Sequence, residues 1–195
     1  MTMRSVRAST LGAAFAAALL LCGCGGGAPE TFDLSAASVP PARPLRAQIA
    51  IREPIASLDL DSQRILVRAG PESVAYLSGA QWSDKLPILV QSRLVQTFQN
   101  AQLVRSVARA GTGSDADYSL ELDIRAFEFD AAAMRATVDI AGKLVERQTG
   151  RTVAARLFRT EVPAAGSGGP AVAAALDGAL ATIMAQIVAF VSAKL

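Results

Sequence analysis

The stretch Tyr118-Ser-Leu-Glu-Leu-Asp-Ile-Arg125 decides the fold, because its apolar and polar residues alternate without a break. Tyr118, Leu120, Leu122 and Ile124 fall on one face of an extended chain, and the polar residues fall on the other. Such alternation is typical of a β-strand that has one buried face. The stretch therefore predicts a half-buried strand in the body of a sheet.

Two phenylalanines follow this stretch out of phase with it. Phe127 and Phe129 would fall on the polar face if the strand continued regularly. A β-bulge near Ala126 would return them to the core face, because a bulge adds one residue to one strand of a pair. Alternatively, the two rings mark an exposed surface, and on that ground both are candidate partner contacts.

Two more strands are predicted downstream. Residues from Met134 to Leu144 alternate again, and Thr149-Gly150 supplies a hairpin turn into a strand over 153–162. Three long antiparallel strands in succession are therefore expected to form the body of the sheet.

Four shorter strands and one helix are predicted upstream. Asp84 is the expected N-cap of the helix, because Pro87 then falls in the first turn, where a missing N–H costs nothing. The helix is expected to run to about Asn100. The strand candidates cover residues 45–52, 64–68, 73–77 and 103–107.

The last element, residues 171–194, has the pattern of a helix with one arc of large apolar residues and one arc rich in Ala. Its uncharged run covers 178–193, which is shorter than the about 20 residues that a membrane span needs. The large-residue arc should therefore pack on the sheet. The Ala-rich arc is either a weakly polar solvent face or a partner interface. The predicted fold class is α+β, with a mostly antiparallel sheet packed by two helices.

The N-terminus carries the features of an export signal. Arg4 and Arg7 precede an apolar run of signal-peptide length. Leu21-Cys-Gly-Cys24 then resembles a bacterial lipobox, in which cleavage leaves the cysteine as an acylated N-terminus. Cys24 fits this role and Cys22 does not, because Leu21 is too bulky beside the cut. We therefore expect a signal peptide over residues 1–23 and a lipid anchor in the membrane through Cys24.

Residues 24–44 are expected to be the acylated cysteine and a flexible tether, because a Gly run begins the segment and a Pro-rich run ends it. Thr31-Phe-Asp-Leu34 is the one part of it with strand character and the one candidate to dock on the domain. Residues 45–195 are expected to form a single domain of ordinary size.

Composition excludes several classes of function. The chain has 19 Lys and Arg against 17 Asp and Glu, and loss of Arg4 and Arg7 with the leader leaves no net charge. We therefore expect no nucleic-acid partner. Histidine is absent and Cys24 is expected to be acylated, which excludes a Ser-His-Asp triad and a Cys-His pair. Pairs of acidic residues at i, i+2 spacing are typical of a solvated strand face. We expect no enzymatic activity, no metal site and no cofactor.

The order of motifs along the chain resembles that of one known family. After the lipobox come Thr31-Phe-Asp-Leu34, Leu58-Asp-x-Asp-Ser-Gln-Arg-Ile-x-Val67, Ala75-Tyr76, Ala80-Gln-Trp-Ser-Asp84 and Leu86-Pro87, and then a helix rich in Leu and Gln. This order is similar to that of the ABC-type transport auxiliary lipoproteins, which include relatives of paraquat-inducible protein C. The resemblance is specific mainly over residues 57–98.

The resemblance implies a domain like the N-terminal domain of TolB and a non-enzymatic role. It implies docking at the outer-membrane end of a lipid path built from an MCE-domain protein, an ABC permease and a cytoplasmic ATPase. Gly25 stands where an aspartate would resemble an inner-membrane retention signal, which favours the periplasmic face of the outer membrane. The alternative function is a lipid-anchored regulator of another envelope machine, such as a peptidoglycan synthase activator.

The segment that matches this family best supplies two further candidates for partner contact, Tyr76 and Trp82. Trp82 lies two residues before the expected cap. It either folds over the helix start near Ile88 or Leu89 and seals the core, or serves as an interface anchor.

Overall fold

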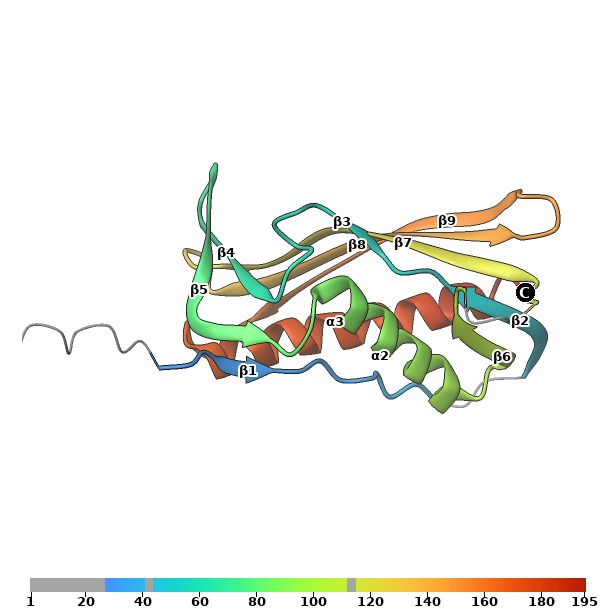
Figure 1. The fold of residues 1–195 in the computed structure, drawn as a ribbon, viewed down its shortest axis with the longest axis horizontal. Coiled ribbons are helices and arrows are strands. Elements are labelled where there is room, and N and C mark those ends of the chain that lie inside the picture. Colours follow the sequence, from blue (N-terminus) through green and yellow to red (C-terminus); the bar gives the residue numbers. More distant parts are fainter. Residues whose placement is uncertain (1–26, 41–43, 112–114) are drawn as a thin grey trace, which may run out of the picture.

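The fold is built on the strand that the alternating stretch predicts (Figure 1). The structure is a computed structural model, and it describes residues 27–40, 44–111 and 115–195. Strand β7 (Tyr118–Asp130) pairs with β8 (Arg135–Glu146), and β8 pairs with β9 (Thr152–Pro163), both in antiparallel register. The three long antiparallel strands are therefore confirmed.

The other side of β7 carries three shorter strands in succession, all parallel to it. They are β2 (Leu45–Ile51), β3 (Ile55–Ala56) and β4 (Arg64–Gly70). Strand β2 also pairs in parallel with β6 (Val104–Arg109), and β4 pairs in antiparallel register with β5 (Ser73–Trp82).

The sheet is thus mixed, which corrects the expectation of a mostly antiparallel sheet. Antiparallel neighbours can be joined by a short turn, whereas parallel neighbours need a crossover connection. The path from β2 to its parallel neighbour β6 runs through helix α2 (Leu86–Ala101). Local alternation along each strand says nothing about such distant pairings, and this is why the parallel part was missed.

A β-bulge in β7 explains the two phenylalanines that are out of phase. The register against β8 shifts between Ile124 and Ala126. The shift returns Phe127 and Phe129 to the buried face, where each ring is 1% exposed. The predicted bulge is therefore confirmed. The alternative prediction, that the two rings form an exposed surface, is wrong.

The two helices lie on the same side of the sheet (Figure 1). Helix α3 (Gly169–Ser192) turns its large apolar residues into the core, among them Leu176, Ile183 and Ile187, as the arc pattern predicts. Among the described residues, α3 is the helix that is long and apolar enough to cross a membrane by length and composition, and 56% of its apolar stretch is buried in the domain. Burial of this kind is typical of a core helix.

Helix α2 starts one residue later than predicted. Its N-cap is Lys85, which makes no side-chain cap bond, and the expected cap at Asp84 is wrong. Oδ1 of Asp84 accepts a hydrogen bond of 2.7 Å from the amide of Lys85 and so acts outside the helix. The first helical amide, that of Leu86, donates to the carbonyl of Ser62 at 3.1 Å. A loop carbonyl therefore replaces the side-chain cap.

The segment before β2 is folded along much of its length. Strand β1 (Glu30–Phe32) pairs in parallel with β5, and Leu34 and Ala37 are buried. Docking of Thr31–Leu34 is therefore confirmed. A free tether over all of residues 25–44 is corrected, because residues 30–39 pack on the domain. We call residues 30–39 the strap.

Candidate functional site

Three of the four aromatic candidates for partner contact lie in the core. The rings of Trp82 and Phe127 meet edge to face, with centroids 5.8 Å apart, and Phe129 belongs to the same buried cluster. Trp82 is as fully buried as the two phenylalanines. The prediction that these three side chains contact a partner is therefore wrong. They are core residues, because they lie on the side of the sheet that the helices cover.

Tyr76 remains accessible, and Cys24 lies outside the described residues. The Tyr76 ring is half-buried, and the guanidinium carbon of Arg64 lies 3.3 Å from its centroid. A cation held over an aromatic face is attracted by the ring quadrupole. The pair therefore presents a planar, positively charged patch at the β4–β5 hairpin.

The open face of the sheet carries exposed apolar side chains. Cα pairing joins Ile55 to Asp123, Asp123 to Ala141 and Ala141 to Leu157, so these four residues form one row across the sheet. Paired residues share a face of the sheet. Ile55 is 72% exposed and Leu157 is 60% exposed. We call this row, together with the exposed Leu58 in the turn after β3, the open-face row.

Charged side chains cover the neighbouring part of the open face, and they neutralise one another. Arg68 donates two hydrogen bonds to Glu128, of 2.7 and 2.8 Å. One carboxylate oxygen of Glu161 lies 2.8 Å from Arg159 and the other lies 3.4 Å from Arg135. Arg159 also lies 3.7 Å from the carboxylate of Asp139. The bond with Glu128 raises the pKa of Arg68, and the bond with Arg159 lowers the pKa of Glu161. This region is therefore balanced in charge.

Strand β9 forms an edge of the described sheet. It pairs with β8 and with no other described strand, and it is 12 residues long. An edge strand presents unpaired main-chain N–H and C=O groups, to which an added strand of a partner can bond. Leu157 projects from the middle of this edge on the open face. The edge and the open-face row thus form one continuous surface.

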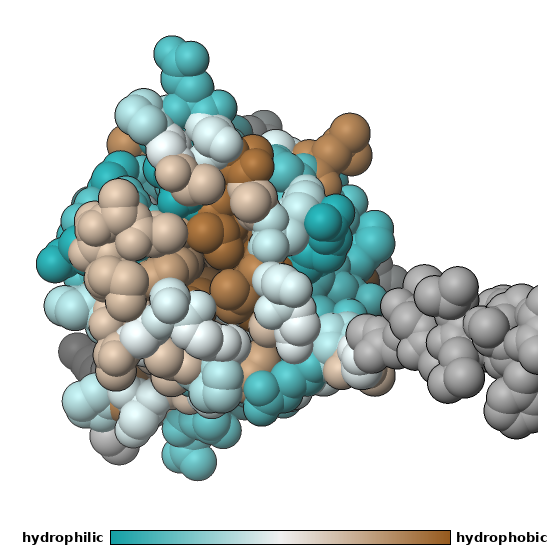
Figure 2. All heavy atoms as spheres, turned by 90° about the vertical axis from the view of Figure 1, so that its left-hand side faces the viewer, coloured by the Kyte–Doolittle hydropathy of each residue, from teal (hydrophilic) through white to brown (hydrophobic). Residues whose placement is uncertain are grey.

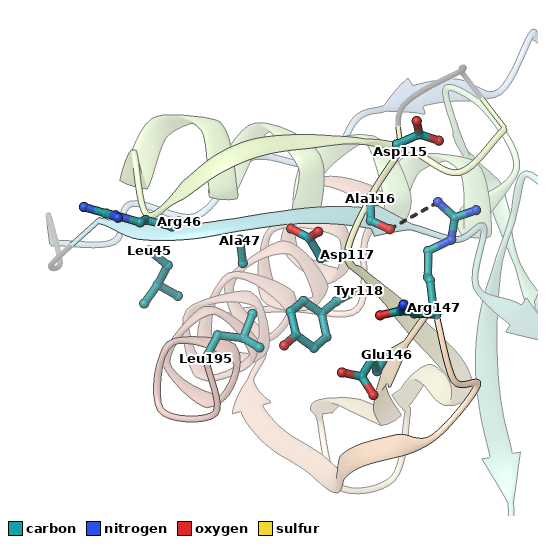
Figure 3. Close-up of a pocket in the computed structure, with 11 residues that line it drawn as sticks. Leu45, Arg46, Ala47, Asp115, Ala116, Asp117, Tyr118, Glu146, Arg147 and Leu195 are labelled. Atoms are coloured by element: carbon teal, nitrogen blue, oxygen red, sulfur yellow. Dashed lines mark hydrogen bonds between the residues drawn. The ribbon is translucent and has the colours of Figure 1, made fainter.

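A hollow of about 690 Å³ lies at the C-terminal end of α3 (Figure 3). The ring of Tyr118 points into it beside Leu195, and the carboxylates of Asp117 and Glu146 lie around the ring (Figure 3). Oδ2 of Asp117 accepts a hydrogen bond of 2.8 Å from the amide of Gln48. The main chain of β2 therefore fixes the carboxylate of Asp117 at the rim.

Arg147 adds a positive charge to the rim of this hollow. Arg147 donates to the carbonyl of Ala116 at 3.3 Å, so its guanidinium is fixed at the rim (Figure 3). Among the described residues, the lining of this hollow has no Ser, Thr, Cys or Lys. The described part of the chain holds no group of three side chains arranged to take a metal ion.

Sequence reasoning missed the open-face row, although part of the signal was present. Leu157 stands next to Phe158 in the predicted strand, and only Phe158 is buried. A large apolar residue on the polar phase of a strand marks an exposed apolar position. Ile55 gave no such signal, since it follows Pro54 in a strand of two residues.

Residues 32–188 match the family of ABC-type transport auxiliary lipoprotein components. The match begins at the last residue of β1 and ends inside α3, so it includes most of the strap, strands β2 to β9, helix α2 and most of α3. The chain belongs to this family.

Two proteins are similar to this chain, one by sequence and one by both sequence and fold. The protein bll6063 of Bradyrhizobium diazoefficiens is 32% identical over 170 residues, which cover 84% of this chain and 46% of that protein. The chain therefore spans about half the length of this curated relative. The crystal structure of protein XCC0632 from Xanthomonas campestris has a TM-score of 0.78 and 29% identity, and it covers 84% of this chain and 95% of its own.

A third protein shows the fold alone. The structure of the hypothetical protein CT253 from Chlamydia trachomatis has a TM-score of 0.54 at 9% identity, over 77% of this chain and 98% of its own. The family is named for lipoprotein components of ABC-type transport systems.

Proposed function

We propose that this auxiliary lipoprotein is an outer-membrane-anchored, non-enzymatic component of an ABC/MCE-type intermembrane lipid transport system. The family match over residues 32–188 is the observation that carries the proposal. The protein acts by docking: it binds an MCE-domain protein that connects to the ABC permease and its ATPase.

Anchoring is assigned to Cys24, through the lipobox Leu21-Cys-Gly-Cys24. Each buried methylene of an acyl chain contributes about 0.8 kcal/mol, and two or more chains make attachment stable. Gly25 favours the outer membrane, where the domain faces the periplasm. The anchor sets the location, and the domain supplies the binding surface.

The docking surface is assigned to the open-face row and the β9 edge. Ile55 and Leu157 are large apolar side chains that the domain itself does not cover. Apolar anchors surrounded by polar groups are typical of the centre of a binding interface. The paired charges around Glu128 and Glu161 supply a polar rim that needs no counter-charge from the partner.

Co-purification tests this function. Full-length protein is extracted from membranes in mild detergent, with the Cys24→Ser form as the control, and captured proteins are identified by mass spectrometry. We expect an MCE-domain protein with the acylated protein and a strong loss of it with Cys24→Ser. Recovery of a peptidoglycan synthase without any MCE-domain protein would contradict the proposal and favour the envelope regulator instead.

A further inference from the structure

One end of the domain is formed by turns that meet where the strap begins (Figure 1). The amide of Ala131 donates to the carbonyl of Arg68 at 3.2 Å, and the amide of Ala164 donates to the carbonyl of Met134 at 2.9 Å. The β7–β8 turn therefore touches both the β4–β5 hairpin and the loop before α3. We call this the strap end.

The start of α3 also lies at the strap end, against β1. A Cβ atom placed on Gly169 would come within 3.2 Å of the Phe32 ring and of Ala80. Glycine is thus required for this close approach. The first residues of the strap are therefore fixed beside the turns, and the described residues before it, 27–29, are exposed (Figure 1).

Apolar side chains at the strap end are left partly uncovered. Val67, Phe129, Ala136 and Val162 form one row on the helix side of the sheet. The middle of the row is buried, whereas Val67 and Val162 are half-buried and Met134 in the adjacent turn is exposed. Figure 2 faces this end and shows apolar side chains over its middle with polar ones around them.

The proposed anchor lies a short distance along the chain from this end. Cys24 precedes Glu30, the first residue of β1, by six positions. Six residues span at most about 20 Å when fully extended. A membrane that holds the acyl chains of Cys24 is therefore within about 20 Å of the strap end, which leaves little room for a protein partner between them.

We propose that the strap end rests on the lipid surface of the membrane that holds Cys24. The inference depends on the lipid anchor of the proposed function and adds the orientation of the domain. The strap end faces the bilayer with its apolar centre, and the opposite end, with the Tyr118 hollow, points away from it. Two cations near the strap end, Arg68 and Arg135, are paired with Glu128 and Glu161.

Site-specific quenching tests the orientation. The only cysteines are Cys22 and Cys24, so a cysteine introduced into the acylated mature chain is the single free thiol. Full-length lipoprotein carrying Ala133→Cys at the strap end is labelled with an environment-sensitive dye and reconstituted into vesicles of phosphatidylethanolamine and phosphatidylglycerol. Gln148→Cys, in the β8–β9 turn at the opposite end, is the matched control.

A quencher attached to the lipid chains gives the readout. We expect quenching at position 133 to exceed quenching at position 148 at least threefold. A Met134→Glu change in the 133-labelled protein should reduce that quenching, and Leu157→Glu on the open face should not. Equal quenching at the two positions, in protein that floats with the vesicles, overturns the orientation and leaves the anchor intact. Failure of the unmutated protein to float, to the same extent as Cys24→Ser, overturns the anchor itself.

Discussion

The main-chain amide of Ser35 donates a hydrogen bond of 2.7 Å to Oδ1 of Asp177, across 142 residues of sequence. A second bond of 3.0 Å joins the amide of Ala37 to Oγ1 of Thr97. The strap is thus tied to α3 by the first bond and to α2 by the second. The amide of Ala37 is buried, and a buried amide without a partner costs about 1–3 kcal/mol, so the second bond fixes the strap to the domain more strongly than the exposed first one.

Removing the hydroxyl of Thr97 should loosen the strap. Thr97→Val leaves the buried amide of Ala37 without its partner, and we expect a loss of about 1–3 kcal/mol in the free energy of unfolding. Thr182→Val is the control, because that exposed hydroxyl bonds only the carbonyl of Gly178 in its own helix. Urea unfolding gives the free energy of unfolding of each variant, and the rate of hydrogen exchange at the Ala37 amide reports how often the strap opens. Equal effects of the two changes would show that the bond to Ala37 contributes nothing.

The strap should also respond to acid. A hydrogen bond from Arg93 lowers the pKa of Asp33 below its ordinary value of 3.8. A carboxyl whose folded-state pKa is depressed stabilises the fold above its unfolded-state pKa and loses this effect as pH falls through the folded value. Asp33 is half-exposed, so the effect is small, at most about 1 kcal/mol.

The stability difference between the unmutated protein and Asp33→Asn measures this effect. We expect the difference to be constant from pH 7 to about pH 5, and to shrink as the pH falls below the ordinary pKa of 3.8 and through the lowered folded-state pKa. Unfolding curves at each pH give the values. A difference that is the same at pH 7 and pH 2.5 would contradict an ionised Asp33 as its source.

The antiparallel body should not tolerate a methyl group at Gly142. A Cβ there would lie 3.0 Å from Cε2 of Phe158 and 3.3 Å from Cδ2 of Leu122. We expect Gly142→Ala to lower the free energy of unfolding by about 1–3 kcal/mol through overpacking. Gly178→Ala in α3 meets no atom within 4 Å and should stabilise the helix by about 0.5–1 kcal/mol. Thermal unfolding compares the stability of each variant with that of the unmutated protein. A loss of stability in both variants would point to a cause other than packing.

Trp82 should behave as a core residue in solution. It is the single tryptophan of the chain, so its fluorescence reports one site. We expect emission at short wavelength, weak quenching by acrylamide and no change when a protein partner binds. Trp82→Ala should cost about 3–5 kcal/mol of stability. A solvent-exposed emission spectrum in the folded protein would restore Trp82 as a surface anchor.

The antiparallel strands were predictable because their signals are local. Leu120, Leu122 and Ile124 alternate with polar residues, and the phase change at Phe127 indicated the bulge that the register shows. The turn at Gly150 was visible for the same reason, and its φ of 71° favours glycine. The likeness to TolB stays a prediction.

The parts that failed depend on contacts between distant segments. The strap has the composition of a linker, and its pairing with β5 and its bonds to Thr97 and Asp177 show that it is part of the domain. Asp84 is a residue type that commonly caps helices, but the first helical amide donates its hydrogen bond to the carbonyl of Ser62 instead. Aromatic residues were taken as interface candidates, whereas the exposed apolar side chains of the open face are Ile55 and Leu157.

In-cell photocrosslinking tests the central claim, that the open face docks a lipid-transport partner. A photoreactive amino acid replaces Leu157 in the full-length protein, and Gln99 on the exposed side of α2 is the control position. We predict a covalent adduct with an MCE-domain protein from position 157 and none from position 99. An adduct with a peptidoglycan synthase from position 157, and none with an MCE-domain protein, would contradict the account.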